Sequence, residues 1–441
     1  MNIFIDSNIP PAPYPTPESH TWELIGGNGR NASWTDDASQ DRVRALCVFR
    51  GELYAGIGTA QAEVWKFDGN EWEQVAGGGI NRSWPAFTGA PGEGAGPNPG
   101  YVWVNSFLSD AAETCLYAGI KNNKGAELWR FDGSAWELAG GRGEIGDWQA
   151  PDYDHVYTLA WHEGVLHAGM HGHSSSFGAG KFADDQGASK SGSSARYMPE
   201  FGNGEIYRFD GGRWERISGQ RINGSWDEDH STNVVYKLLS LKDDLYAAIG
   251  RFAVNHMRWT GEVWRMSNGR WERLGGEGIR NSWNLNSTNL VTSLLDYQGK
   301  LIVGYNCQAC PDQQETFGNV WAWDPESEDW HMLSQPVECE DPSQIPNQKS
   351  FNISDTFNGH LVFGSGRANI TGKLAIWLLD IENDRWVCLG HPNQANYLNP
   401  DHAEIWKRNE YAYSMAVFNG DLIVGFKGPD GTGDVWRCTA E

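Results

Sequence analysis

A thirteen-residue motif that begins and ends with tryptophan recurs five times in this chain, and its two tryptophans are always twelve positions apart. The copies are WELIGGNGRNASW from Trp22, WEQVAGGGINRSW from Trp72, WELAGGRGEIGDW from Trp136, WERISGQRINGSW from Trp214 and WERLGGEGIRNSW from Trp271. Chance does not give five copies at one spacing, so the chain is built from internal repeats.

Two shorter phrases divide the chain further. The first is LYAGI at Leu53 and Leu116, LHAGM at Leu166, LYAAI at Leu245, LIVGY at Leu301, LVFGS at Leu361 and LIVGF at Leu422. The second is VWKFDG at Val64, LWRFDG at Leu128, IYRFDG at Ile206, VWRMSNG at Val263, VWAWD at Val320, IWLLD at Ile376 and VWRC at Val435. Together they define seven units of roughly 50–80 residues, a period typical of propellers, solenoids and arrays.

Each unit predicts four short strands. In the first unit they are residues 43–49, 53–57, 64–67 and 72–75, rich in β-branched and aromatic residues. The sequence Asp68-Gly69-Asn70 predicts a hairpin turn between the last two, and no segment has a helical period. We therefore expect an all-β fold, a seven-bladed β-propeller of four-stranded antiparallel blades.

The two ends of the chain complement each other. The last unit stops after its third strand, whereas residues 21–25 form a strand with no partner nearby. We expect this N-terminal strand to pair with the C-terminal blade and close the ring, which removes exposed sheet edges.

Residues 1–20 are Pro-rich and predict an extended arm, either a disordered tail or a docking arm. The propeller would span residues 21–441, with approximate blades 42–75, 101–139, 154–217, 232–275, 288–334, 350–390, and 411–438 with 21–26.

The lengths of the connections between strands indicate which face of the propeller binds a ligand. Links between the second and third strands, and between successive units, vary widely, whereas the other links are nearly uniform. In an up-and-down blade the two variable kinds leave from the same end. Variable loops on a rigid scaffold are where binding residues gather, so this face is the expected binding face.

The GGxGxxxSW and VWxFDGxxW phrases resemble the repeats of tectonin-like and kelch-like propellers along nearly the whole chain. This resemblance implies the propeller architecture. Tectonin-like propellers include lectins that bind a sugar on each blade or between blades, so the resemblance also implies a carbohydrate-binding function.

The tryptophans that close the repeated motif are candidate ligand-binding residues. A sugar ring would stack on each indole, and nearby asparagines would bind its hydroxyls. The candidates are Trp34, Trp84, Trp148, Trp226, Trp283, Asn31, Asn81, Asn223 and Asn281. The alternative is that each tryptophan is wedged between adjacent blades as a structural pin, with glycines supplying positive φ.

Polar residues that precede the expected first strands form a second candidate group. They are Asp41, Asp154, Asn233, Asn289 and Glu410. The first strand of a blade lines the central channel, so these side chains would ring its mouth, and their oxygens are the ligands that Ca²⁺ prefers. Solvated turn residues are the alternative, and no cofactor is required.

Histidines and cysteines give two further candidate sites. His167, His171 and His173 lie before a Gly- and Ser-rich run and would bind a transition metal; loop histidines without a metal are the alternative. Cys307, Cys310 and Cys339 lie on the expected binding face and would form a disulfide, a zinc site or free thiols.

The charge and hydropathy of the chain exclude some classes of partner and location. The net charge of −23 argues against nucleic acid and against anionic membranes as partners. No apolar run predicts a transmembrane helix, and the N-terminus does not resemble a Sec signal peptide. This predicts cytoplasmic synthesis, and the final location is open, with a virion or another extracellular particle as one destination.

Three functions remain. The first is a non-enzymatic recognition module that binds a glycan, in a lectin-like way, or a protein. The second is a structural or adhesion component of a larger assembly, such as a phage virion or tail, docked through residues 1–20. The third is a glycan hydrolase or lyase that uses Asp41, Asp154 and Glu410, although no catalytic motif is present.

Overall fold

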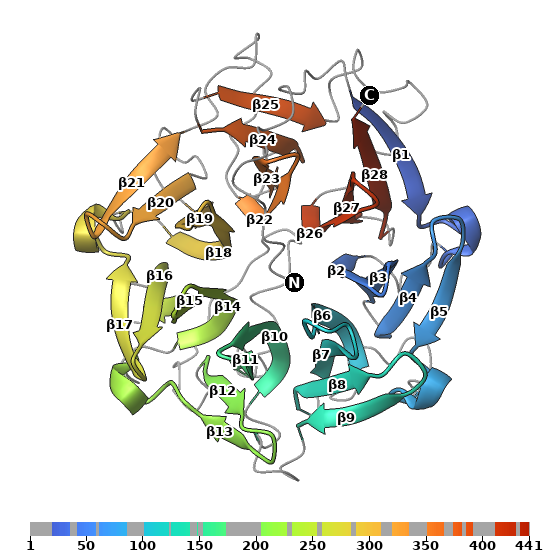
Figure 1. Ribbon diagram of the computed structural model, residues 1–441, viewed down its shortest axis with the longest axis horizontal. Coiled ribbons are helices and arrows are strands. Elements are labelled where there is room, and N and C mark those ends of the chain that lie inside the picture. The colour runs from blue at the N-terminus through green and yellow to red at the C-terminus, as the bar shows by residue number, and fades with distance from the viewer. Residues whose placement is uncertain are drawn as a thin grey trace, which may run out of the picture.

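The computed structural model is an all-β structure, in which the described strands pair antiparallel and the described residues form no α-helix (Figure 1). The described residues are 20–35, 42–58, 61–85, 101–122, 125–141, 148, 153–172, 204–226, 232–253, 258–283, 288–309, 320–334, 351–365, 374–381, 385–390, 411–428 and 433–440. Within these segments no helix has the length and hydropathy needed to cross a membrane. Most of the Pro-rich arm, residues 1–19, lies outside them.

The strands form four four-stranded sheets and one twelve-stranded sheet. The sheet that begins the chain's repeats contains β2 (Val43–Phe49), β3 (Glu52–Ile57), β4 (Glu63–Phe67) and β5 (Trp72–Ala76). Two later sheets contain β18 (Thr288–Tyr297), β19 (Lys300–Ala309), β20 (Val320–Asp324) and β21 (Asp329–Ser334), and β22 (Phe351–Phe357), β23 (His360–Ser365), β24 (Ile376–Asp380) and β25 (Arg385–Gly390). The observed bounds of β2 to β5 agree with the expected strands to within one residue.

The twelve-stranded sheet consists of three four-stranded groups. They are β6 (Tyr101–Ser109), β7 (Leu116–Asn122), β8 (Glu127–Phe131) and β9 (Trp136–Gly140); β10 (Tyr153–His162), β11 (Val165–Gly172), β12 (Ile206–Phe209) and β13 (Trp214–Arg216); and β14 (Thr232–Leu241), β15 (Asp244–Ala253), β16 (Arg258–Ser267) and β17 (Arg270–Gly275). Pairing is extensive within each group. Between groups it is limited to His155 with Lys121 and His171 with Val234.

The remaining sheet joins the two ends of the chain. It contains β26 (Tyr411–Phe418), β27 (Asp421–Lys427), β28 (Val435–Ala440) and β1 (His20–Gly26). Strand β1 pairs antiparallel with β28, with Trp22 opposite Cys438. Figure 1 shows the strand groups arranged around a common centre, with β2, β6, β10, β14, β18, β22 and β26 innermost and β1 at the rim beside β28.

The apolar core lies between neighbouring groups. Phe49 and Tyr54 of one group pack with Val104 and Leu116 of the next. The glycine of the repeated LYAG phrase permits this approach, because a Cβ on Gly56 would lie 2.7 Å from Val104. At the junction of the last and first groups, a Cβ on Gly425 would likewise meet Val43 at 2.7 Å. The repeated phrase is therefore explained by close packing between groups.

In six of the strand groups, a tryptophan of the outermost strand connects the group to the one before it. Its indole N–H donates to a backbone carbonyl in, or one residue after, the preceding outer strand. The pairs are Trp22 with Leu389, Trp72 with Ile25, Trp136 with Val75, Trp214 with Ala139, Trp271 with Ile217 and Trp330 with Leu274. The first tryptophan of the thirteen-residue motif thus has a structural role.

Short 3₁₀ turns follow four of the outer strands. They are η2 (Arg30–Ala32), η3 (Ile80–Arg82), η5 (Ile222–Gly224) and η7 (Ile279–Asn281).

Candidate functional site

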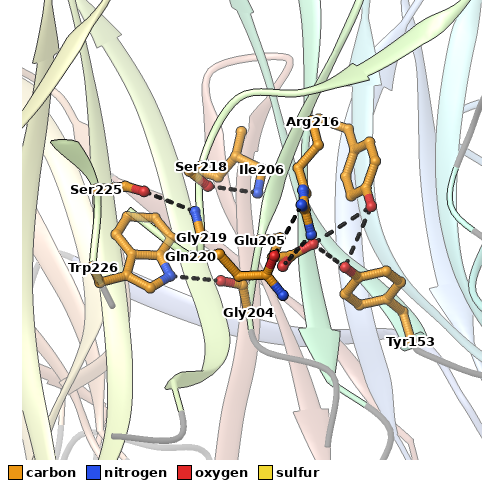
Figure 2. Close-up of polar contacts among 11 residues, drawn as sticks. Tyr153, Gly204, Glu205, Ile206, Arg216, Ser218, Gly219, Gln220, Ser225 and Trp226 are labelled. Carbon is orange, nitrogen blue, oxygen red and sulfur yellow. Dashed lines mark hydrogen bonds and ion pairs between the residues drawn. The ribbon is translucent and has the colours of Figure 1, made fainter. Parts of the chain in front are cut away.

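The loop tryptophans, which the sequence presents as sugar-stacking candidates, are buried. Trp34, Trp84, Trp148, Trp226 and Trp283 are each at most 3% exposed. Each indole N–H donates to a backbone carbonyl, and Figure 2 shows this for Trp226, whose donor lies 2.9 Å from the oxygen of Gly204. Neither ring face nor N–H is therefore presented to a ligand at these five positions.

Each loop tryptophan packs edge-on against the aromatic rings of the following strand group. Trp84, for example, makes T-shaped contacts with Trp129 and Trp136 at ring-centroid distances of 5.7 and 5.6 Å. Such contacts add stability beyond the area that they bury. This geometry matches the alternative role of a pin between adjacent strand groups.

Three of the candidate asparagines form hydrogen bonds within their own loop. Asn31, Asn81 and Asn223 have positive φ and donate from their side chains to carbonyls of the outer strand just before the loop. Asn281 is not equivalent to them, because Arg280 occupies the matching position, with φ 51°. Asn281 therefore lies near Trp283 in the sequence without occupying the loop position that Asn31, Asn81 and Asn223 share.

A buried carboxylate lies beside the third group's loop. Figure 2 shows Glu205, 2% exposed, receiving hydrogen bonds from Tyr153 and Arg216. Burial raises the pKa of Glu205, although Tyr153 and Arg216 oppose that rise. Glu63, Glu127 and Glu262 accept similarly from the aromatic residue two positions later on the strand, which indicates a repeated structural role.

A different cluster, on the innermost strands, consists of ionisable side chains that are not part of the repeated motifs. Asp154 and His155 lie on β10 and His171 lies opposite on β11. Nδ1 of His155 and Nδ1 of His171 both contact Oδ1 of Asp154, the latter at 3.0 Å. Asp154 and His155 are 2% and 4% exposed, so the cluster is almost closed to solvent.

The charges of this cluster are set by burial and by its partners. Burial disfavours the Asp154 carboxylate, but His155 and His171 outweigh that effect and hold the pKa of Asp154 well below its ordinary value. Burial lowers the pKa of His155 well below its ordinary value, against the pull of Asp154.

Next to this cluster, cationic side chains surround a single indole. We call Arg42, Arg44, Trp103, Asn105 and Lys121 the inner-strand patch. The guanidinium carbons of Arg42 and Arg44 lie 5.1 and 4.1 Å from the ring centroid of Trp103, and Nζ of Lys121 lies 4.3 Å from it. Lys121 also lies 3.7 Å from Oδ2 of Asp154, which joins the patch to the cluster.

Three donors of the patch are buried and have no acceptor among the residues that the structure describes. They are Nε of Arg44, Nε1 of Trp103 and Nδ2 of Asn105. Buried donors are normally bonded, because an unmet donor costs about 1–3 kcal/mol. The patch is therefore suited to a ligand that brings acceptor oxygens.

A repeated backbone irregularity turns residues of the innermost strands out of the regular pairing. A register shift leaves one residue out of the ladder at the same position of each such strand. These residues are Arg44, Asn105, Tyr157, Tyr236, Thr292, Asn352 and Tyr413. Bulges of this kind re-aim a side chain and are frequent beside active sites. Two members of the patch, Arg44 and Asn105, are such residues.

The expected ring of oxygen ligands is only partly described. Asp41 and Glu410 lie outside the described residues, as do the side chains of Asn233 and Asn289. Asp154 is placed, but its neighbours are two imidazoles and an ammonium group, not carboxylates. Asp154, the member of the ring whose side chain is described, thus lies among nitrogen-bearing side chains.

Of the histidine and cysteine candidates, too, the structure describes some side chains and not others. His171 is in the cluster, whereas His167 contacts the carbonyl of Val165 and the ring of His162. His173, Cys310 and Cys339 lie outside the described residues, as does the side chain of Cys307.

His155 was missed in the sequence. The regular register from the turn, in which His162 pairs with Val165, would place His155 opposite Gly172. The register shift between Val156 and Thr158 places it opposite His171 instead. The comparisons with known proteins add no assignment: no family model matches the chain, and no curated protein matches it.

Proposed function

We propose that the chain is a seven-bladed β-propeller whose ring is closed by β1, and that it is a non-enzymatic binding module. The closure is supported by the pairing of β1 with β28, by the hydrogen bond from Trp22 to Leu389, and by the contact of Gly425 with Val43. Each of these contacts joins segments at opposite ends of the sequence.

The binding site in this proposal is the inner-strand patch, and the ligand is an acidic glycan that has carboxylate or sulfate groups. The three unpartnered buried donors carry the proposal, because they lie beside three cations in a protein whose net charge is −23. Sugar hydroxyls and an acidic group would supply acceptors to Trp103 and Asn105 and a negative charge to Arg44.

The position of the patch agrees with this role. Arg42 and Arg44 lie where β2 begins, and Lys121 lies where β7 ends. In a propeller these ends open on the face of the variable loops, which are the expected binding loops. The ligand would therefore approach from that face, along the innermost strands.

A glycan array that contains matched acidic and neutral sugars tests the proposal. We expect the folded protein to bind acidic glycans, and Arg44→Gln to weaken that binding at least tenfold. Arg82→Gln is the matched control, because Arg82 is exposed in η3, which follows the outer strand β5 and not an innermost strand. Added salt should weaken binding of the acidic sugars.

Two results would count against this function. One is a folded protein that binds no acidic glycan on the array. The other is an affinity that Arg44→Gln and Arg82→Gln leave equally unchanged, which would place the binding site elsewhere.

A further inference from the structure

Three potential metal ligands converge at the innermost strands of the third group. The nitrogen and oxygen ligand atoms of Asp154, His155 and His171 all lie within 4.8 Å of one another. Two of the residues are almost fully buried, and His171 is about one-fifth exposed. A small ion with one side open to its surroundings would fit this arrangement.

The backbone is shaped to bring the three together. Neighbouring residues of a regular strand point to opposite faces of the sheet. The pairing of β10 with β11 shifts between Tyr153 and His155, so that Asp154 is an extra residue, left out of the strand register. Because of this shift, Asp154 and His155 both face His171.

The second carboxylate oxygen is held separately. Nζ of Lys121 lies 3.7 Å from Oδ2 of Asp154, while both imidazoles contact Oδ1. A partner on the outer oxygen fixes the orientation of a carboxylate that uses its other oxygen as a ligand. The arrangement thus separates a binding oxygen from an anchoring oxygen.

We propose that Asp154, His155 and His171 form a binding site for a divalent transition metal ion of the Zn²⁺ class. Two imidazoles and one carboxylate favour such an ion over Ca²⁺ or Mg²⁺, which prefer oxygen ligands throughout. Three protein ligands leave a coordination position for another molecule. The site adjoins the acidic-glycan site through Lys121, but the metal proposal does not depend on the glycan proposal.

Direct titration with Zn²⁺ tests the site in the full chain after dialysis against a chelator. We expect tight binding by the wild-type protein and the loss of one equivalent, or a weakening of at least about 100-fold, in Asp154→Asn and in His171→Gln. His331→Gln is the control, because His331 is exposed on β21. Co²⁺ in place of Zn²⁺ should give visible absorption bands in the wild type that both cluster variants lack.

A melting measurement covers the case in which a variant folds poorly. The three ligands are brought together only in the folded state, so Zn²⁺ should raise the Tm of the wild type more than that of Asp154→Asn. The proposal is overturned if the folded wild-type protein binds no Zn²⁺, or if Asp154→Asn and His171→Gln bind it as tightly as the wild type does.

Discussion

The indole N–H of Trp22 donates a hydrogen bond to the carbonyl oxygen of Leu389, 2.7 Å away, although 367 positions separate the two residues. The same bond, between an outer-strand tryptophan and the preceding outer strand, recurs between residues far closer in sequence, as in Trp72 with Ile25. The junction between the ends of the chain is therefore built like the junctions within it.

Trp22→Phe should lower the free energy of unfolding by about 1–3 kcal/mol, because the carbonyl of Leu389 loses its donor in a buried place. Denaturant unfolding measures the change. Trp72→Phe is the matched variant, and a similar loss is expected there. A loss at Trp72 without one at Trp22 would mean that the terminal junction does not contribute to stability.

Trp84→Phe should separate packing from ligand binding. The substitution removes the hydrogen bond from the indole to Ala62 and part of a fully buried ring, so it should also lower stability by about 1–3 kcal/mol. Affinity for an acidic glycan should stay within twofold of the wild-type value, measured by titration below the unfolding temperature. A large loss of affinity in a folded variant would return the loop tryptophans to the binding site.

Asp355 predicts a pH dependence of stability. Burial raises its pKa to about 6 from 3.8, against the influence of a backbone N–H and of Lys237. The neighbouring protein displaces water from around Lys237, and this desolvation lowers the pKa of its ammonium group. The folded state binds more protons than the unfolded state between about pH 4 and 6, so the contribution of Asp355 to stability falls as pH rises through that window.

Asp355→Asn should remove this fall and stabilise the protein at neutral pH relative to the wild type. Unfolding curves recorded from pH 4 to 7 give the comparison. Asp243→Asn, at an exposed turn, should leave the wild-type pH profile in place. Parallel profiles for Asp355→Asn and the wild type would contradict the assignment.

Two thiols on strands, Cys47, which is partly buried, and Cys438, which is buried, should resist alkylation. Burial raises the pKa of Cys47 to about 11 and also raises that of Cys438, which is fully buried. Because the thiolate is the reactive form, both should react with iodoacetamide at pH 8 at least 100-fold more slowly in the folded protein than in guanidinium. Mass spectrometry of the labelled peptides gives both rates, and equal rates would show that the strands open readily.

The strands could be predicted because their signal is local. Alternating apolar residues, Asp-Gly turns and repeated phrases locate β2 to β5 to within a residue. The loop tryptophans show the limit of this reasoning, since fixed spacing indicates a common environment and does not distinguish a buried one from an exposed one. The hydrogen bonds of the Trp84 and Trp226 indoles to backbone carbonyls, which the structure provides, show that these rings are buried.

The cluster and the patch could not be predicted because they depend on pairing. His155 meets His171 through the register of a hairpin, and Lys121 reaches Asp154 from a neighbouring group. The bulges that turn Arg44 and Asn105 out of the ladder leave no mark in residue type, since arginine, asparagine, tyrosine and threonine all occupy that position.

The recurrence of one bulge on every innermost strand has a consequence for engineering. The bulged residue is left out of the strand pairing, so its side chain can be exchanged with little effect on the ladder around it. Positions such as Tyr157, Tyr236 and Thr292 then form a set that can be randomised together on an unchanged scaffold. Selection from such a library would yield new specificities without redesign of the fold.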